Sequence, residues 1–279
     1  MTKVYITALT NERYIPGALA LARSLHDTGT KYELAVMIPE DKKECLGSAL
    51  QEYGVLDVPG TFILTKENIK LDEMDSIVDQ RYSYWRETFF KLQATECTEY
   101  DKVILLDCDM LVLKNIDHLF DAPDYSAVVC GKCVHPDWLD LNSGLLVLTP
   151  STELHNRLIS CIKPTIENRK AAGLQAGDQD VFQYEYPDWR NHPELCLPEK
   201  YSVWWNIIDE LCEKEKYRPK DFYVIHFLGN KKPWDYDKKY YLKIAKLMIK
   251  QDKTKKLLYK VLIWRKYRLL CEKHRITRK

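Results

Sequence analysis

The stretch DKVILLDCDMLVL, residues 101–113, places Asp107 and Asp109 inside an otherwise apolar run. Apolar runs of this length are typical of buried strands. Carboxylates are almost never fully buried unless they are paired or bind a metal. The run therefore predicts a strand that brings two carboxylates to a place where a cation or a shared proton neutralises them.

Strand and helix patterns alternate on both sides of this run. Strand patterns occupy residues 3–9, 32–38, 61–65, 102–107, 125–130, 143–150 and 222–229, and helical patterns occupy residues 11–27, 39–53, 84–97 and 151–170. Such alternation predicts an α/β fold with a mostly parallel, Rossmann-like sheet flanked by helices. Ligands of these sheets bind at the carboxyl ends of the strands. We therefore expect Asp107 and Asp109 to face a crevice rather than the core.

The composition is that of a globular protein, with 46% hydrophobic and 30% charged residues among 279. The N-terminus lacks the pattern of a secretory signal, and no segment has the roughly 18 uninterrupted apolar residues of a membrane span. The chain has nine cysteines, an odd number that does not divide into disulfide pairs and is consistent with reduced thiols. We therefore expect a cytoplasmic protein. The motif CGKC, from Cys130 to Cys133, has the spacing of half a redox or zinc site. Because we find no second pair, we favour structural cysteines.

The charge is distributed unevenly along the chain. Residues 238–279 hold 16 Lys and Arg against 2 Asp and Glu, a net charge of +14, whereas residues 1–237 hold 26 against 39, a net charge of −13. A stripe at helical spacing consists of Lys239, Lys243, Lys246, Lys250 and Lys253. We predict a main domain over 1–237 and a basic helical tail over 238–279. We favour docking of the tail on an anionic membrane, at its inner face, over packing on the acidic body. No motif predicts nucleic-acid binding.

The two aspartates are candidate metal ligands. At alternate positions of a strand their side chains would project from the same face, and oxygen ligands favour Mg²⁺ or Mn²⁺. The segment VIHFLGNKKPWDY, residues 224–236, adds His226, Gly229 and Lys232. An imidazole ligand shifts the preference towards Mn²⁺, and the glycine and lysine suit a metal-bound diphosphate. Because both segments end predicted strands, we expect one metal site at a single sheet edge.

Five segments together resemble the glycosyltransferase family of glycogenin and the bacterial lipopolysaccharide galactosyltransferases. LLDCDMLVLKNIDHLF (105–120) looks like that family's DxD segment, and HFLGNKKPW (226–234) is similar to its H-x-x-G-x-x-K-P-W segment. LNSGLLVLTP (141–150), GDQDVF (177–182) and TALTNERYIPGALALARSL (7–25) resemble its N-S/A-G strand, its D-Q helix start and its uridine-binding loop. The matches follow the family's order from residue 3 to about residue 236.

The resemblance implies a GT-A fold over residues 1–237 and the transfer of a hexose, glucose or galactose, from a UDP-sugar with retention of configuration. The implied acceptor is a glycan or glycolipid of the cell-surface or lipopolysaccharide type, and the implied metal is Mn²⁺, with Mg²⁺ as the alternative. The implied metal ligands are Asp107, Asp109 and His226, and the implied uridine pocket consists of Ala8, Thr10, Asn11 and Tyr14. The residues implied to contact the diphosphate and the sugar side are Lys91, Gly229 and Lys232. Those implied to hold the transferred sugar are Asn142, Ser143, Asp178 and Gln179.

Gln179 and Asp178 are the candidate catalytic residues. Gln179 is neutral, so its carbonyl would shield an oxocarbenium-like centre rather than attack it. We prefer a same-face transfer, in which the acceptor hydroxyl enters beside the departing phosphate. The alternative is a covalent glycosyl-enzyme, for which Asp178 would be the nucleophile.

Other functions also fit parts of the sequence. A self-glucosylating primer like glycogenin is the first, although Tyr201 and Tyr217 are weak acceptor candidates and Gln175 replaces a carboxylate usual before GDQ. From other classes, a haloacid-dehalogenase-type phosphatase also places DxD after a strand, and an inactive sugar-nucleotide-binding module would share the motifs. Trp204 and Trp205 fit either a sugar-stacking acceptor wall or the core.

Overall fold

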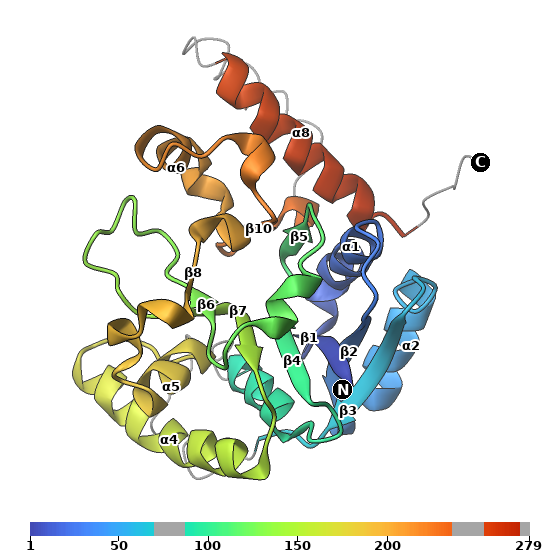
Figure 1. The fold of residues 1–279 in the computed structure, drawn as a ribbon. Helices are drawn as coiled ribbons and strands as arrows, with labels where there is room; N and C mark the ends of the chain where they lie inside the picture. The colour runs from blue at the N-terminus through green and yellow to red at the C-terminus, as the bar shows by residue number, and fades with distance from the viewer. Residues whose placement is uncertain (70–86, 236–253, 274–279) are drawn as a thin grey trace.

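The structure is a computed structural model that describes residues 1–69, 87–235 and 254–273 (Figure 1). Its middle layer is a seven-stranded sheet in the order β3-β2-β1-β4-β7-β6-β8. The strands are β1 (Lys3–Ala8), β2 (Glu33–Pro39), β3 (Thr61–Lys66), β4 (Lys102–Leu106), β6 (Ala127–Val128), β7 (Asn142–Leu148) and β8 (Cys196–Leu197). Strands β1 to β4 are parallel, and β7 runs antiparallel between β4 and β6. The predicted mostly parallel α/β sheet is confirmed.

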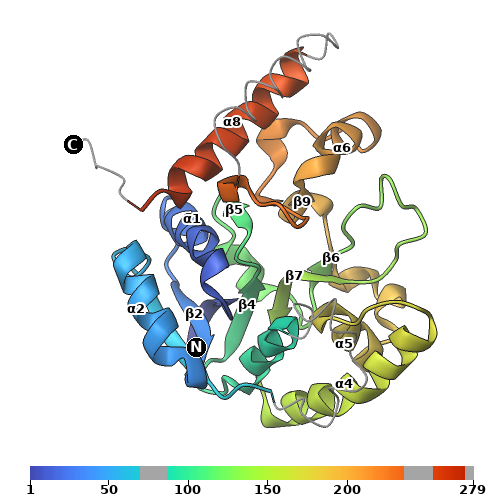
Figure 2. The same ribbon diagram turned by 180° about the vertical axis from the view of Figure 1, so that it is seen from behind.

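Helices cover both faces of this sheet (Figures 1 and 2). The described helices include α1 (Ile15–His26), α2 (Lys43–Tyr53), α4 (Thr152–Ala171), α5 (Asp178–Glu185), α6 (Ile208–Lys214) and α8 (Thr254–Cys271). Because side chains alternate along a strand, Tyr5 packs with α1 and α2, and Val4 and Ile6 pack on the other face with α4 and α5. Gly54, with φ of 84°, ends α2 in the left-handed conformation that glycine tolerates best.

A second, three-stranded sheet begins where the aspartate segment ends. It has the order β5-β10-β9 and consists of β5 (Met110–Val112), β9 (Val203–Trp204) and β10 (Val224–His226). Strand β10 is antiparallel to β5 and pairs His226 with Met110. The predicted late strand over 222–229 therefore exists in shortened form, but it belongs to this second sheet rather than to the main one.

The predicted helix over 84–97 is found in its described part, mostly as a 3-10 helix rather than an α-helix. Residues 84–86 lie outside the described residues, and Phe89–Glu96 forms a 3-10 helix. All residues from Phe89 to Thr95 are buried, including Lys91 and Gln93. This segment crosses the core and has no solvent-facing side, so the one-sided packing of an amphipathic α-helix does not apply to it.

The described part of the basic tail packs on the body. Helix α8 lies beside α1 in both views (Figures 1 and 2), and its Ile263, Trp264, Tyr267 and Leu270 are buried in a hydrophobic cluster shared with β10. The Arg23 guanidinium of α1 donates hydrogen bonds to the carbonyls of residues 270 and 272, at 2.9 and 2.7 Å. The lysine stripe from 239 to 253 lies outside the described residues, so the preferred membrane contact of the tail stays a prediction. Among the described helices, none is both long and apolar enough to span a membrane.

Candidate active site

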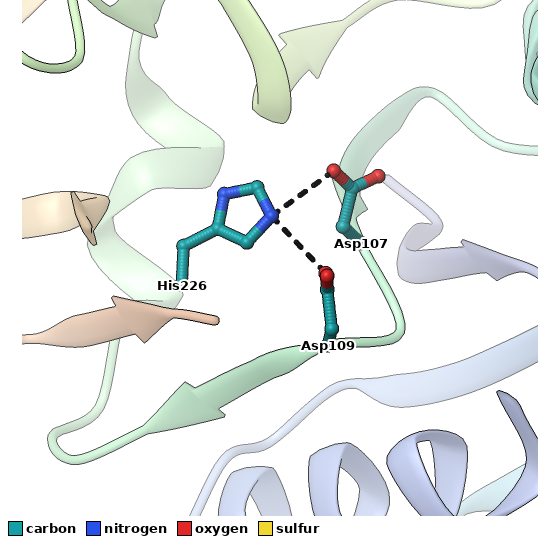
Figure 3. Close-up of side chains that lie close together, drawn as sticks. All are labelled: Asp107, Asp109 and His226. Carbon is teal, nitrogen blue, oxygen red and sulfur yellow. Dashed lines mark ion pairs between the residues drawn. The ribbon is translucent and has the colours of Figure 1, made fainter. Parts of the chain in front are cut away.

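Asp107, Asp109 and His226 meet at the junction of the two sheets. Asp107 follows β4, Asp109 precedes β5, and His226 is the last residue of β10. The Nε2 atom of His226 lies 3.5 Å from Oδ2 of Asp107 and 3.1 Å from Oδ1 of Asp109 (Figure 3). One ligand atom from each residue lies within 4.8 Å of the other two. Two carboxylates and an imidazole at this spacing fit a divalent cation such as Mn²⁺.

The backbone around these ligands differs from the prediction. Asp107 and Asp109 are not alternate positions of one strand, because residues 107–109 form a turn that the Met110 amide closes by donating to the Asp107 carbonyl at 3.2 Å. The ligands also do not share one sheet edge. Pairing of β5 with β10 brings them together, and the Phe227 amide donates to the Asp109 carbonyl at 3.0 Å. The predicted grouping is thus found, but for a different structural reason.

A glycine allows the main sheet to approach His226. A Cβ atom on Gly144 of β7 would lie 2.8 Å from Cε1 of His226 and 2.9 Å from the Met110 side chain. The Nδ1 atom of His226 is buried without a hydrogen-bond partner among the described residues, whereas Nε2 faces the two carboxylates. The imidazole is therefore oriented with Nε2 towards the acidic pair.

Two lysines neutralise the acidic pair. The Nζ atom of Lys91 lies 2.6 Å from Asp107 and 2.7 Å from Asp178, and that of Lys232 lies 2.5 Å from Asp109. Burial opposes the charge of Lys91, but the two carboxylates outweigh it and hold its pKa above the ordinary value. Burial would likewise raise the pKa of Asp109, but His226 and Lys232 outweigh it and hold that pKa well below the ordinary value. The charges of Lys91 and Asp109 therefore persist at neutral pH.

The start of β7 faces the start of α5. The Asn142 side chain donates to Oε1 of Gln179 at 2.7 Å, and the Ser143 hydroxyl donates to Oδ2 of Asp178 at 2.7 Å. The Ser143 amide also donates to Oε1 of Gln179 at 3.4 Å. These bonds fix the four predicted sugar-binding residues relative to one another and to Lys91.

The predicted uridine residues line the same cavity, and Tyr14 lies beside Lys232, whose Nζ atom is 5.8 Å from the Tyr14 ring centroid. The side chains of Thr10 and Asn11 both donate to Oε2 of Glu87, at 2.9 and 2.7 Å. Tyr14 packs edge-on against Trp234, with ring centroids 6.0 Å apart. Sequence reasoning missed Glu87, because it lies inside a helix-like stretch with no motif to mark it.

All but one of the predicted site residues line a single cavity of about 870 Å³. Those that line it are Ala8, Thr10, Asn11, Tyr14, Lys91, Asp107, Asp109, Asn142, Ser143, Asp178, Gln179, His226 and Lys232. Gly229 does not line it; this residue is exposed on the loop after β10, with φ of 99°, where other residues would be strained. Glu87 and Arg169 also line the cavity, although the sequence did not mark them.

The other candidates lie outside the cavity. Trp205 stacks on Phe227 at 5.2 Å, and Trp204 packs against Gly131, so both tryptophans are packing residues. Cys130 and Cys133 are free, buried thiols. The described residues contain one group with metal-ligating geometry, the acidic pair with His226. A structural role for the CGKC cysteines stays a prediction.

Comparisons with known proteins relate the chain to glycosyltransferases. Residues 5–138 match the family model described as Glycosyl transferase family 8. The chain is 29% identical over 239 residues to glycogenin-1 of Caenorhabditis elegans, covering 84% of this chain and 51% of that one. It is 31% identical over 250 residues to UDP-glucuronate:xylan alpha-glucuronosyltransferase 2 of Arabidopsis thaliana, covering 85% of this chain and 37% of that one. The chain thus spans about half or less of the length of these two relatives.

The fold has relatives among solved structures. The crystal structure of the galactosyltransferase LgtC in complex with donor and acceptor sugar analogs matches with a TM-score of 0.56 at 14% identity. The match covers 85% of this chain and 90% of that one, and it shows that the two share the GT-A fold. Residues 5–138 therefore belong to glycosyl transferase family 8, and glycogenin-1 is a relative over 84% of this chain.

Proposed function

We propose that this protein transfers a hexose, glucose or galactose, from a UDP-sugar to a hydroxyl of a glycan or glycolipid acceptor, with retention of configuration. The observation that carries the proposal is the cavity that joins Asp107, Asp109 and His226 to Lys91 and Lys232. Its volume of about 870 Å³ lies within the range of small-molecule sites. Family membership argues against the phosphatase alternative.

The acidic pair and His226 would hold Mn²⁺, with Mg²⁺ as the alternative. A bound ion there would stabilise the negative charge that develops on the departing UDP. Lys91 and Lys232 stay protonated at neutral pH because carboxylates surround them. They would keep positive charge beside the diphosphate. Thr10, Asn11 and Tyr14, which line the same cavity, would enclose the uridine.

The contacts of α5 favour the same-face mechanism. Oδ2 of Asp178 already interacts with both Lys91 and Ser143, which withdraws electron density from the carboxylate and weakens it as a nucleophile. Oε1 of Gln179 is held by Asn142 and lies on the cavity wall. We infer that Gln179 orients the sugar and shields its anomeric centre, and that Asp178 binds sugar hydroxyls.

The positions of the tyrosines favour transfer to a separate acceptor. Tyr201 is buried, and its hydroxyl bonds Nε2 of His118 at 2.8 Å. Neither Tyr201 nor Tyr217 lines the cavity, so neither is placed to receive sugar as a glycogenin-like primer. A cell-surface or lipopolysaccharide-type acceptor reached from the cytoplasm is our proposal.

A screen of UDP-sugars tests this function. We expect UDP release from UDP-glucose or UDP-galactose in the presence of Mn²⁺, and no release after a chelator removes the metal. Phosphate release from a monoester, or no turnover and no binding of any UDP-sugar, would contradict the proposal.

A further inference from the structure

Tyr267 of α8 lies directly beneath the metal-binding turn. Its side chain is fully buried, and its hydroxyl donates to the carbonyl of Cys108 at 3.4 Å. Cys108 is the residue between the two candidate metal ligands, Asp107 and Asp109. A helix some 160 residues further along the chain therefore contacts the backbone of the DxD turn.

The same ring contacts the segments that carry the other charged residues of the site. It stacks on Phe227, the neighbour of His226, with centroids 4.4 Å apart and an interplanar angle of 22°. It also lies 6.1 Å from the ring of Trp234, two residues after Lys232. The Phe227 backbone N–H donates a hydrogen bond to the Asp109 backbone carbonyl at 3.0 Å. The Phe227 carbonyl accepts one from Nζ of Lys232, also at 3.0 Å. One side chain thus touches the turn of the aspartates, the end of β10 and the lysine loop.

The Cys108 carbonyl is confined from a second side. Gly17 of α1 packs so closely that a Cβ atom there would lie 2.6 Å from this oxygen and 2.7 Å from the Trp234 ring. The Cys108 thiol donates to the Ala8 carbonyl at 3.1 Å. The turn is therefore held by α1, by β1 and, through one hydroxyl, by α8.

We propose that Tyr267 is a positioning residue for the metal site, and that α8 thereby belongs to the catalytic machinery rather than to a separate tail. The inference rests on the proposed metal site. Groups that orient metal ligands from behind typically change metal affinity about 10- to 100-fold when removed. A tyrosine that only filled the core would change stability without changing metal affinity.

The test is direct titration of Mn²⁺, without nucleotide, into wild-type protein, Tyr267→Phe and Tyr259→Phe. Tyr259 is the matched control, because it lies on the same helix and its hydroxyl donates to a backbone carbonyl, that of Pro219, at 3.1 Å. Phenylalanine keeps the stacking of ring 267 on Phe227, so the variant is expected to fold. We expect Tyr267→Phe to weaken Mn²⁺ binding about tenfold and Tyr259→Phe to leave it unchanged. Thermal unfolding of the apoproteins reports stability separately.

The outcomes separate this inference from the proposed function. If wild-type protein binds no Mn²⁺, the proposed metal site is wrong, and the role of Tyr267 is wrong with it. Wild-type protein that binds Mn²⁺, with Tyr267→Phe binding equally well, overturns the inference alone. Equal weakening in both variants also overturns it, because that result reports a general loss of stability. Selective weakening in Tyr267→Phe supports it.

Discussion

Gln179 lies in the first turn of α5 and on the cavity wall, and its Oε1 atom accepts a hydrogen bond from the Asn142 side chain. This bond fixes the orientation of the Gln179 side chain. We predict that Gln179→Ala lowers kcat and kcat/KM together, by at least about tenfold, and leaves UDP affinity within about twofold. The reason is that its proposed contact is to the sugar centre and strengthens in the transition state. Gln183→Ala is the control, since Gln183 lies on the same helix, donates to the Leu141 carbonyl and does not line the cavity. An unchanged kcat at saturating donor and acceptor would remove Gln179 from the mechanism.

Gly17 and Gly47 provide a matched pair of helical glycines. Alanine at Gly17 would meet the Cys108 carbonyl and Trp234, whereas at Gly47 its nearest neighbour would be Ile63 at an ordinary 3.6 Å. We predict that Gly17→Ala lowers the free energy of unfolding by about 1–3 kcal/mol through overpacking. Gly47→Ala should raise it by up to about 1 kcal/mol through helix propensity. Urea denaturation measures both, and equal effects would show that the close packing at Gly17 is unimportant.

At the scale of elements, α8 is part of the folded body. Leu270 is 1% exposed and its neighbour Leu269 is 44% exposed. We predict that Leu270→Ala costs about 2–5 kcal/mol of unfolding free energy, whereas Leu269→Ala stays within about 0.5 kcal/mol. Chemical denaturation tests this. Equal, small effects would mean that α8 is only loosely attached, as a separate tail would be.

The strands and helices that the sequence predicted well are those with uninterrupted patterns. The largely apolar runs of β1, β2 and β4 and the helical pattern of α1 are uninterrupted, and the structure has these elements within a few residues of the predicted ends. The short strand β5 could not be predicted, because its residues 110–112 continue the apolar run of β4 and only the turn at Asp107 separates them. The spacing of residues 84–97 predicted a helix, but the 3-10 form of Phe89–Glu96 and its burial on all sides depend on the tertiary structure around it.

The candidate site was more predictable than the fold around it. Its polar residues occupy positions in recognisable sequence motifs, so the sequence alone grouped Asp107 with His226. The grouping did not require the finding that these residues lie at the ends of strands in different sheets. Glu87 and Tyr267 could not be predicted in this way. Their contacts to Asn11 and to the Cys108 carbonyl depend on distant segments that only the tertiary structure brings together.

At the scale of the whole molecule, the cavity lies where two sheets meet, and the basic segment lies at the end of an acidic chain. Packing of α8 leaves its Arg265 and Lys266 exposed, so packing and membrane contact are compatible. We therefore keep membrane docking as a prediction, and we test it by changing surface charges, because removing α8 would disrupt the core.

We predict salt-sensitive binding to anionic liposomes and none to neutral ones, because the screening length falls from roughly 10 Å at 0.1 M salt to 3 Å at 1 M. A double variant that carries Arg265→Gln and Lys266→Gln should bind the liposomes more weakly, since each basic residue near an anionic membrane surface contributes roughly 1 kcal/mol. The control is Lys163→Gln with Lys170→Gln, which alters two exposed lysines of α4. Co-sedimentation measures binding. Absence of binding at low salt, or equal effects of the two pairs, would contradict membrane docking through the tail.

The proposed function depends most on the metal site, and Mn²⁺ binding followed by electron paramagnetic resonance tests that site most directly. Asp109→Asn is preferable to Asp109→Ala, because asparagine keeps a side-chain oxygen that can accept a hydrogen bond from the buried Lys232 ammonium, whereas alanine keeps none. Asp140→Asn, at a partly exposed pair with Arg190, is the control. We predict one bound Mn²⁺ per chain and Mn²⁺-dependent UDP binding in wild-type protein and Asp140→Asn, and the loss of both in folded Asp109→Asn. Unchanged Mn²⁺ and UDP binding in Asp109→Asn would contradict the assignment of Asp109 as a metal ligand.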